Sequence, residues 1–167
     1  INLMDGKNDF QNQIHVIAPL IHKNWLDLGD KEGWKLEYHK PYKFLPSHIK
    51  DDNVSAASRI PEIFSLVGLK IVPRDEAGFH KKIDFEKILQ GEPTLTKLSK
   101  AEHQGWVKFK ESRGWKYSAI RNDDQKKHNC MVEWDKLPEK EKDKDRDAVK
   151  NYERILDQAG FIIVKAD

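Results

Sequence analysis

LPSHIKDDNVSAASRIPEIFSLVGLKIV, residues 45–72, and LPEKEKDKDRDAVKNYERILDQAGFIIV, residues 137–164, are the stretches that decide how this chain folds. They align without a gap at a shift of 92 residues, and nine positions are identical. The residues before them repeat as well, because residues 14–36 align on residues 95–117 at a shift of 81 with five identities. Self-similarity of this kind predicts a duplicated structural unit.

The two copies differ in length at one place. The shift grows from 81 to 92, and 92 − 81 = 11, so the second copy carries eleven extra residues between Tyr117 and Leu137. The extra segment includes the run from Arg121 to His128, which has no counterpart in the first copy. Any function that depends on this run therefore belongs to the second copy alone.

Each copy predicts a first helix with one apolar face. Apolar residues recur at spacings of three and four, which places them on one side of a helix. Trp25 and Trp106 lie within these faces and are predicted to pack in the core. Gly33 and Gly114 are expected to end the two helices, since glycine tolerates the left-handed conformation found there.

A second helix and a strand follow in each copy. The second helices are expected over about residues 53–67 and 145–159, and a glycine ends each of them. The short β-branched runs at 69–72 and 161–164 predict strands. Charges of alternating sign at 133–147 indicate a solvated loop that enters the second helix.

These elements divide the chain into two units and a linker. The first, shortened unit is predicted over residues 1–72 and the second, complete unit over residues 94–167. Residues 73–93 contain prolines and glycines, which is typical of a linker, and one short helix is expected near 84–90.

Composition excludes several functional classes. The 167 residues include 30 Lys and Arg against 28 Asp and Glu, so a nucleic-acid partner that needs a broad positive surface is not expected. The single cysteine, Cys130, allows no disulfide within the chain and suits a reducing compartment. No apolar stretch reaches the length of a membrane span, so we expect a soluble, cytoplasmic protein.

The sequence carries no recognisable catalytic or metal-binding motif. Glycine-rich phosphate loops, the Gly-x-Ser-x-Gly elbow and the His-Glu-x-x-His motif are all missing, and no two of the seven histidines have zinc-site spacing. His22 and His103, at matching positions of the repeat, are expected to donate structural hydrogen bonds to loop carbonyls. We therefore predict no enzyme activity, no metal site and no bound cofactor.

The second copy resembles the ryanodine receptor repeat, or RyR domain, over nearly its whole length. The resemblance rests on a spaced pattern of matching residues, which are His103, Trp106, Gly114, Trp115, Tyr117, Arg121, Asp123, Asp124, His128, Trp134, Leu137, Pro138, Asp145, Arg146, Ala148 and Gly160. One departure is Asn129, where the family usually has proline. The first copy fits at its helices and strand only.

The resemblance implies an α+β fold with two tandem pseudo-symmetric repeats, each with two main helices packed on a small antiparallel sheet. It also implies a bacterial or phage protein whose paired repeats follow an upstream nucleotide-binding domain. The start at Ile1 instead of Met is consistent with a C-terminal piece of such a chain. Paired repeats of this family look able to bind adenine nucleotides, so an adenine-nucleotide-like small molecule is the implied ligand.

Two alternatives stay open for Trp34 and Trp115, the tryptophans that follow Gly33 and Gly114. Each could anchor its own unit in the core. Alternatively, the two indoles could sandwich a flat base across a cleft between the units. The residues expected to bind the ligand in that case are Trp34, Trp115, Tyr117, Arg121, His128 and Arg146.

Two functions from different classes follow from these alternatives. The favoured one is a non-catalytic ligand-sensing module that regulates an attached domain. The other is a protein–protein interaction or structural module of a larger regulatory protein, in which the tryptophans only pack. A structure bears on the two: Trp34 and Trp115 lining one open cleft favours the sensor, and both buried in separate cores favours the structural module.

Overall fold

The computed structural model describes residues 6–167 and consists mainly of helices, so the first five residues of the expected first unit lie outside the described part of the chain. The α-helices are α1 (Gly6–Asn12), α2 (Ile14–Glu32), α3 (Ser47–Ser65), α4 (Phe85–Gln90), α5 (Glu92–Ser112), α6 (Glu139–Lys150) and α7 (Tyr152–Gln158). Three short 3-10 helices join them, which are η1 (Tyr42–Phe44), η2 (Arg74–Phe79) and η3 (Trp134–Lys136).

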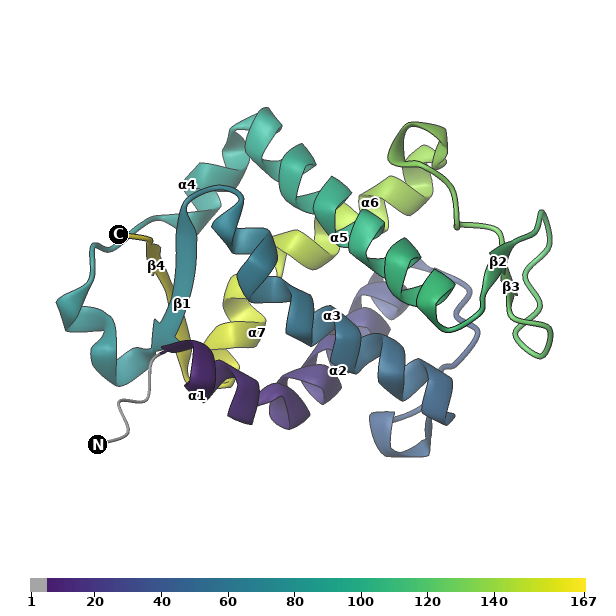
Figure 1. Cartoon of the computed structure of the whole chain (residues 1–167), viewed down its shortest axis with the longest axis horizontal. Helices are drawn as coiled ribbons and strands as arrows, with labels where there is room; N and C mark the ends of the chain where they lie inside the picture. Colours follow the sequence, from purple (N-terminus) through teal and green to yellow (C-terminus); the bar gives the residue numbers. More distant parts are fainter. Residues whose placement is uncertain (1–5) are drawn as a thin grey trace.

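Two small sheets lie at opposite ends of the long axis (Figure 1). At one end, β1 (Leu69–Pro73) pairs antiparallel with β4 (Phe161–Lys165). At the other, the two-residue strands β2 (Lys116–Tyr117) and β3 (Lys127–His128) pair in parallel. Helices with small sheets define an α+β fold, which confirms the expected class.

The expectation of one antiparallel sheet per unit is wrong, because the long strands of the two halves form one shared sheet. Each half of the chain contributes a single long strand, and these two strands pair with each other. The physical reason is that a lone strand leaves a row of backbone N–H and C=O groups without partners, and among the described residues the only strand of comparable length is in the other half. Ile71 pairs with Ile163, and these residues are also equivalent in the repeat, since 163 − 71 = 92.

The second helices begin earlier than expected, directly after each Leu-Pro pair. Pro46 and Pro138 are the N-caps, in extended conformation, so α3 begins at Ser47 and α6 at Glu139. The expectation of a solvated loop over 133–147 is therefore wrong for most of that run. Its charges stabilise a helix instead, because the alternating signs form pairs three residues apart, as between Arg146 and Asp143.

Glycines end the helices where the sequence predicted. Gly33 is the C-cap of α2 with a φ of 73°, and Gly114 follows α5 with a φ of 87°. Both values lie in the left-handed region, which costs glycine little and other residues more. Pro19 lies inside α2, which continues through it.

One core cluster contains residues from both halves of the chain. The ring of Phe64 on α3 packs edge-on against Phe85 on α4 and Tyr152 on α7, with centroids 5.5 and 5.7 Å away. Phe10 on α1 packs in the same way on Phe161 of β4. The helix expected near 84–90 is thus confirmed, but it contributes Phe85 to the core instead of lying in a loose linker. The division at residues 72 and 94 remains a prediction.

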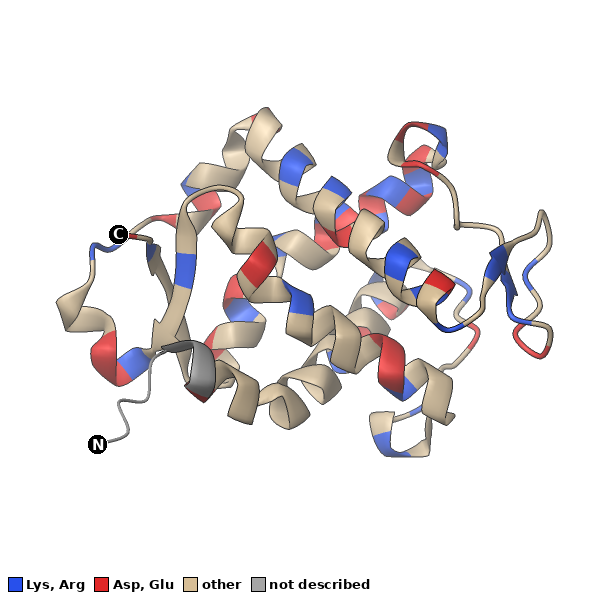
Figure 2. Cartoon of the chain, viewed as in Figure 1, with Lys and Arg blue, Asp and Glu red and all other residues tan. Residues whose placement is uncertain are grey.

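Charged residues of both signs are interspersed along the helices (Figure 2). In the part of the chain that the structure covers, no helix combines the length and the apolar character that crossing a bilayer requires.

Candidate ligand-binding cavity

A cavity of about 430 Å³ lies among α2, α3, α5 and α6. The segments at residues 35–38 and 121–130 complete its walls, so both halves of the chain contribute. The volume falls in the range typical of small-molecule sites.

Two indoles from equivalent positions of the repeat line this cavity. Trp25 comes from α2 and Trp106 from α5, and 106 − 25 = 81. Both side chains are only half-buried, so they are not the helix-face core residues that the sequence indicated. Trp106 stacks on His103, with centroids 6.0 Å apart, and meets the edge of His128 at 4.8 Å. The cavity therefore has aromatic surface available to a planar ligand.

The two matching histidines hold the loops beside the cavity. Nε2 of His22 donates to the carbonyl oxygen of Lys40 at 2.6 Å, and Nε2 of His103 donates to that of Val132 at 2.7 Å. The predicted structural hydrogen bonds are confirmed. The two acceptors are again equivalent, since 132 − 40 = 92. Burial lowers the pKa of His103, so its ring is neutral at pH 7.

Two cations that line the cavity, Arg59 and Lys144, are paired with carboxylates. Arg59 donates to both carboxylate oxygens of Glu102, at 2.6 and 3.3 Å. Nζ of Lys144 lies 3.3 Å from the carboxylate of Glu141. These two charges are largely cancelled, and Lys35, an exposed residue on the cavity wall, is the lining cation that makes no ion pair among the described residues.

Asp145 differs from these carboxylates. It lines the cavity from α6, and among the described residues its side chain receives no hydrogen bond. The closest base is Nδ1 of His103 at 3.8 Å, which is too long for a hydrogen bond. Burial, together with the neighbouring Glu102 and Glu141, raises the pKa of Asp145 to about 8, so this carboxyl group is largely protonated at pH 7.

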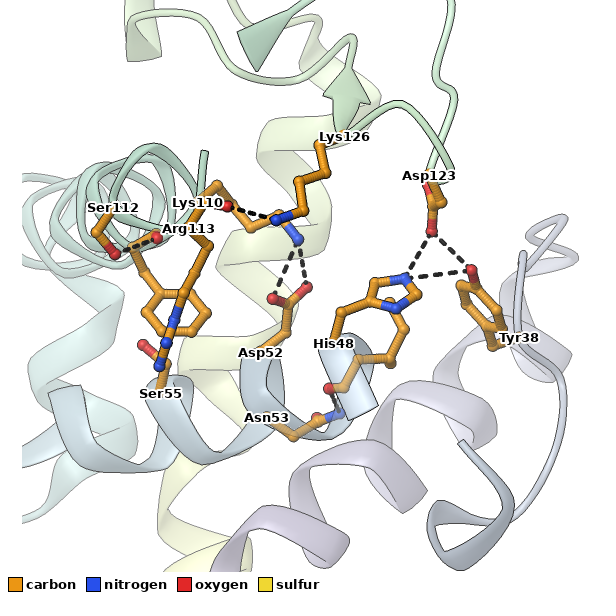
Figure 3. Close-up of polar contacts among 12 residues, drawn as sticks. Tyr38, His48, Asp52, Asn53, Ser55, Lys110, Ser112, Arg113, Asp123 and Lys126 are labelled. Atoms are coloured by element: carbon orange, nitrogen blue, oxygen red, sulfur yellow. Dashed lines mark hydrogen bonds and ion pairs between the residues drawn. The ribbon is translucent and has the colours of Figure 1, made fainter. Parts of the chain in front are cut away.

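Asp123 joins the extra segment of the second half to the first half. Arg121 binds its carboxylate with two bonds of 2.6 and 3.0 Å, Tyr38 donates to it at 2.7 Å, and Nε2 of His48 lies 3.1 Å from it. Figure 3 shows Tyr38 and His48 converging on this carboxylate from the first half. These bonds hold the pKa of Asp123 far below its usual range, although burial acts in the opposite direction.

A buried ion pair lies near the same wall. Nζ of Lys110 donates to both oxygens of Asp52, at 3.1 and 3.2 Å, and the lysine side chain is only 2% exposed (Figure 3). The same nitrogen lies 3.5 Å from the centroid of the Trp115 ring, a cation–π contact. Burial raises the pKa of Asp52 and lowers that of Lys110 against the effect of the pairing.

The expectation that Trp34 and Trp115 sandwich a base across a cleft is wrong, because neither lines the cavity. Trp115 is 4% exposed and lies under Lys110. Trp34 packs behind Trp25 with centroids 5.0 Å apart. Helix geometry explains why Trp25 and Trp106 line the cavity in place of Trp34 and Trp115. The first two lie on the helices and point between the halves, whereas the last two follow the glycines and fold back onto their own helices.

The other expected site residues divide evenly. Arg121 and His128 line the cavity. Burial and the nearby Arg121 and Lys110 lower the pKa of His128 to about 4, so it is neutral at pH 7. Tyr117 is 56% exposed and lies outside the cavity, and Arg146 pairs with Glu139 and Asp143 on α6.

Sequence reasoning missed Trp25, Trp106 and Asp145 as cavity residues. For the tryptophans a signal was present, because His-x-x-Trp is the most distinctive match between the two first helices. For Asp145 the sequence holds no such signal, because it is one of several carboxylates in the charged run at 133–147.

Fold and site together define an α+β protein with a small-molecule-sized cavity between its two halves. Residues 83–165 match the family model of the RyR domain, so the chain belongs to the RyR domain family through its second half. The matched region runs from just before α4 to the end of β4 and includes Trp106, Asp123 and Asp145.

Proposed function

We propose that this chain is a non-catalytic ligand-sensing module that binds a nucleoside-like molecule between Trp25 and Trp106. Trp34 and Trp115 do not line one cleft, so the proposal does not rest on them. The observation that carries it is the cavity of about 430 Å³, into which α2 and α5 each present a half-buried indole. Stacking on aromatic side chains is worth about 1–3 kcal/mol per base, enough to favour a planar ring.

The proposal includes two RyR-like units related by an approximate two-fold axis. The register of the shared sheet supports it, since the pairing is centred on the equivalent residues Ile71 and Ile163. The starts of η1, α3 and β1 also precede those of η3, α6 and β4 by 92 residues each. On this arrangement the ligand lies at the axis, where each unit supplies one tryptophan.

A sensor of this design needs a partner whose state depends on whether the ligand is bound. We propose that this partner is the upstream nucleotide-binding domain that the family resemblance implies in a longer chain. A ligand that contacts α2 and α5 together would fix the two halves relative to each other and pass that constraint to an attached domain.

Binding can be measured directly on this chain. Adenosine, AMP, ATP and cyclic AMP would be titrated by calorimetry, with tryptophan fluorescence and melting temperature as parallel readouts. We expect at least one of these compounds to bind, quench fluorescence and raise the melting temperature. Trp25→Ala and Trp106→Ala should each weaken the binding roughly 5- to 100-fold, the equivalent of one lost stack.

Tyr117→Ala is the matched control, because this aromatic ring is exposed and outside the cavity. It should bind like the unchanged protein, and Trp106→Phe should keep most of the affinity. Lack of any response to all four compounds at millimolar concentration, or equal binding by both alanine variants, would overturn the proposed function.

A further inference from the structure

Asp145 is a cavity carboxyl group that makes no hydrogen bond among the described residues, and unlike Glu37, which also lines the cavity without such a bond, it is partly buried. Glu102 and Glu141 direct their carboxylates to Arg59 and Lys144, and Asp52 directs its own to Lys110. Asp145 receives no hydrogen bond among the described residues, yet 25% of its side chain is accessible from the cavity side of α6. A carboxyl group in that position is available to a ligand.

Asp145 lines the same cavity as the two tryptophans. Its chain neighbour Lys144 contacts the ring of Trp25, with Nζ 5.7 Å from the centroid. On the other side, Asp145 approaches His103, which stacks on Trp106. A planar ring that stacks on Trp106 therefore has an edge on the side of the cavity where this carboxyl group lies.

The repeat places a neutral group at the matching position. Asn53 is equivalent to Asp145, since 145 − 53 = 92, and it too lines the cavity. A side-chain amide and a protonated carboxyl group have nearly the same shape, and although the Asn53 amide donates one N–H to the carbonyl oxygen of Ile49 at 3.0 Å, it keeps a second N–H donor and its oxygen acceptor. The two halves therefore offer the ligand the same kind of hydrogen-bonding group.

We propose that Asp145 is the specificity-determining residue of the cavity and hydrogen-bonds in its neutral form to the amidine edge of a nucleoside-like ligand, that is, a ring nitrogen with an adjacent amino group. This inference rests on the proposed function and names the ligand class within it. The acid O–H donates to the ring nitrogen while the carbonyl oxygen accepts from the amino group. Because Arg59 and Lys144 are each paired with a carboxylate, they offer no free charge to a polyphosphate, which favours a nucleoside at this part of the cavity.

The surroundings of Asp145 keep the carboxyl group neutral. Burial raises its pKa to about 8, and two carboxylates add to this effect while two guanidinium groups oppose it. The charged and titratable groups that face it are Glu102 and His103 on α5, Glu141 and Arg146 on α6, and Arg59 on α3. Binding should therefore weaken as the pH rises above about 8 and the acid proton is lost.

Calorimetric titration with adenosine and purine riboside tests the assignment. Purine riboside lacks the amino group but keeps the ring nitrogen and the sugar, so it loses one of the two bonds. We expect the intact protein to bind adenosine at least 10-fold more tightly than purine riboside. Asp145→Leu should abolish this preference, whereas Asp145→Asn should keep it within about 3-fold, since an amide retains both a donor and an acceptor.

The pH dependence separates the acid from a merely structural residue. Adenosine affinity of the unchanged protein should fall several-fold between pH 7 and pH 9.5, and that of Asp145→Asn should not. Asp143→Asn is the matched control, because Asp143 lies two residues away on α6 with its side chain 64% exposed. This control should show the behaviour of the unchanged protein in every titration.

Unchanged adenosine preference in Asp145→Leu would overturn the inference, and so would tighter binding of ATP than of adenosine. If Trp106→Ala still weakens binding in that case, the proposed function stands and only the role of Asp145 fails. If no ligand binds the unchanged protein, both fail together, so the two failures are distinguishable.

Discussion

At the scale of single residues, Asp145 makes the stability of the fold depend on pH. Its pKa is about 8 in the folded chain and near 3.8 when exposed, so between these values the folded state holds a proton that the unfolded state has lost. Stability therefore decreases as the pH rises from about 4 to 8 and levels off above that.

Asp145→Asn should remove this dependence. We expect the variant to be more stable than the unchanged protein by about 1–3 kcal/mol at pH 8 and equally stable near pH 3, where both states are protonated. Urea unfolding over this pH range measures the difference. A difference that does not change with pH would contradict the raised pKa, whatever the ligand experiments show.

Lys110 is the second residue whose chemistry is set by burial. Lys110→Met keeps the aliphatic length but leaves the Asp52 carboxylate without its partner, so we expect a loss of about 2–4 kcal/mol in unfolding free energy. Lys110→Met combined with Asp52→Asn should recover at least half of that loss, because no buried charge remains. Lys108→Met, at an exposed position of the same helix, should change stability by less than about 0.5 kcal/mol.

At the scale of elements, the extra segment of the second half is held in place chiefly through Asp123. Asp123→Asn weakens its bonds to Arg121, Tyr38 and His48, and we expect amides of residues 116–131 to exchange with deuterium at least 10-fold faster at pH 7. Asp124→Asn is the control, because Asp124 is exposed and makes none of these contacts.

The sign of the pH effect at Asp123 is opposite to that at Asp145. A lowered pKa contributes stability above the unfolded pKa near 3.8, and this contribution is lost as the pH falls below that value. The stability difference between Asp123→Asn and the unchanged protein should thus shrink between pH 5 and pH 2 in urea unfolding. A constant difference over that range would show that Asp123 acts by packing and not by charge.

Elements with local signals were predictable, and those that depend on distant partners were not. Gly33 and Gly114 predict helix ends correctly, because the left-handed conformation at a helix C-terminus is a local requirement that glycine meets. The charged run at 133–147 resembles a solvated loop in sequence, but its place in the cavity wall depends on packing against α5, which lies far away in the sequence. Likewise Trp25 and Trp34 are similar in sequence context, and only the packing of α2 against its neighbours decides which of them meets the cavity.

At the scale of the whole molecule, the two halves depend on each other for their stability. β1 and β4 are each other's only long-strand partner among the described residues, and α3 packs on α5 across the boundary between the halves. The core cluster also joins Phe64 of the first half to Tyr152 of the second. A unit of about 80 residues would lose this shared apolar surface on separation, and domains of that size have little stability in reserve.

The chain should therefore unfold as one cooperative unit, although its sequence is a duplication. Calorimetry should show a single transition with equal van't Hoff and calorimetric enthalpies. The fragment 83–167, which contains the RyR-domain match, should lack a cooperative transition when alone, because β4 and the inner face of α5 are then uncovered. Adding the fragment 6–82 should restore the transition, since it returns β1 and α3. Two separate transitions in the whole chain, or a cooperative transition in fragment 83–167 alone, would mean that the halves fold independently. The cavity would then lie at the interface of two independently folded domains.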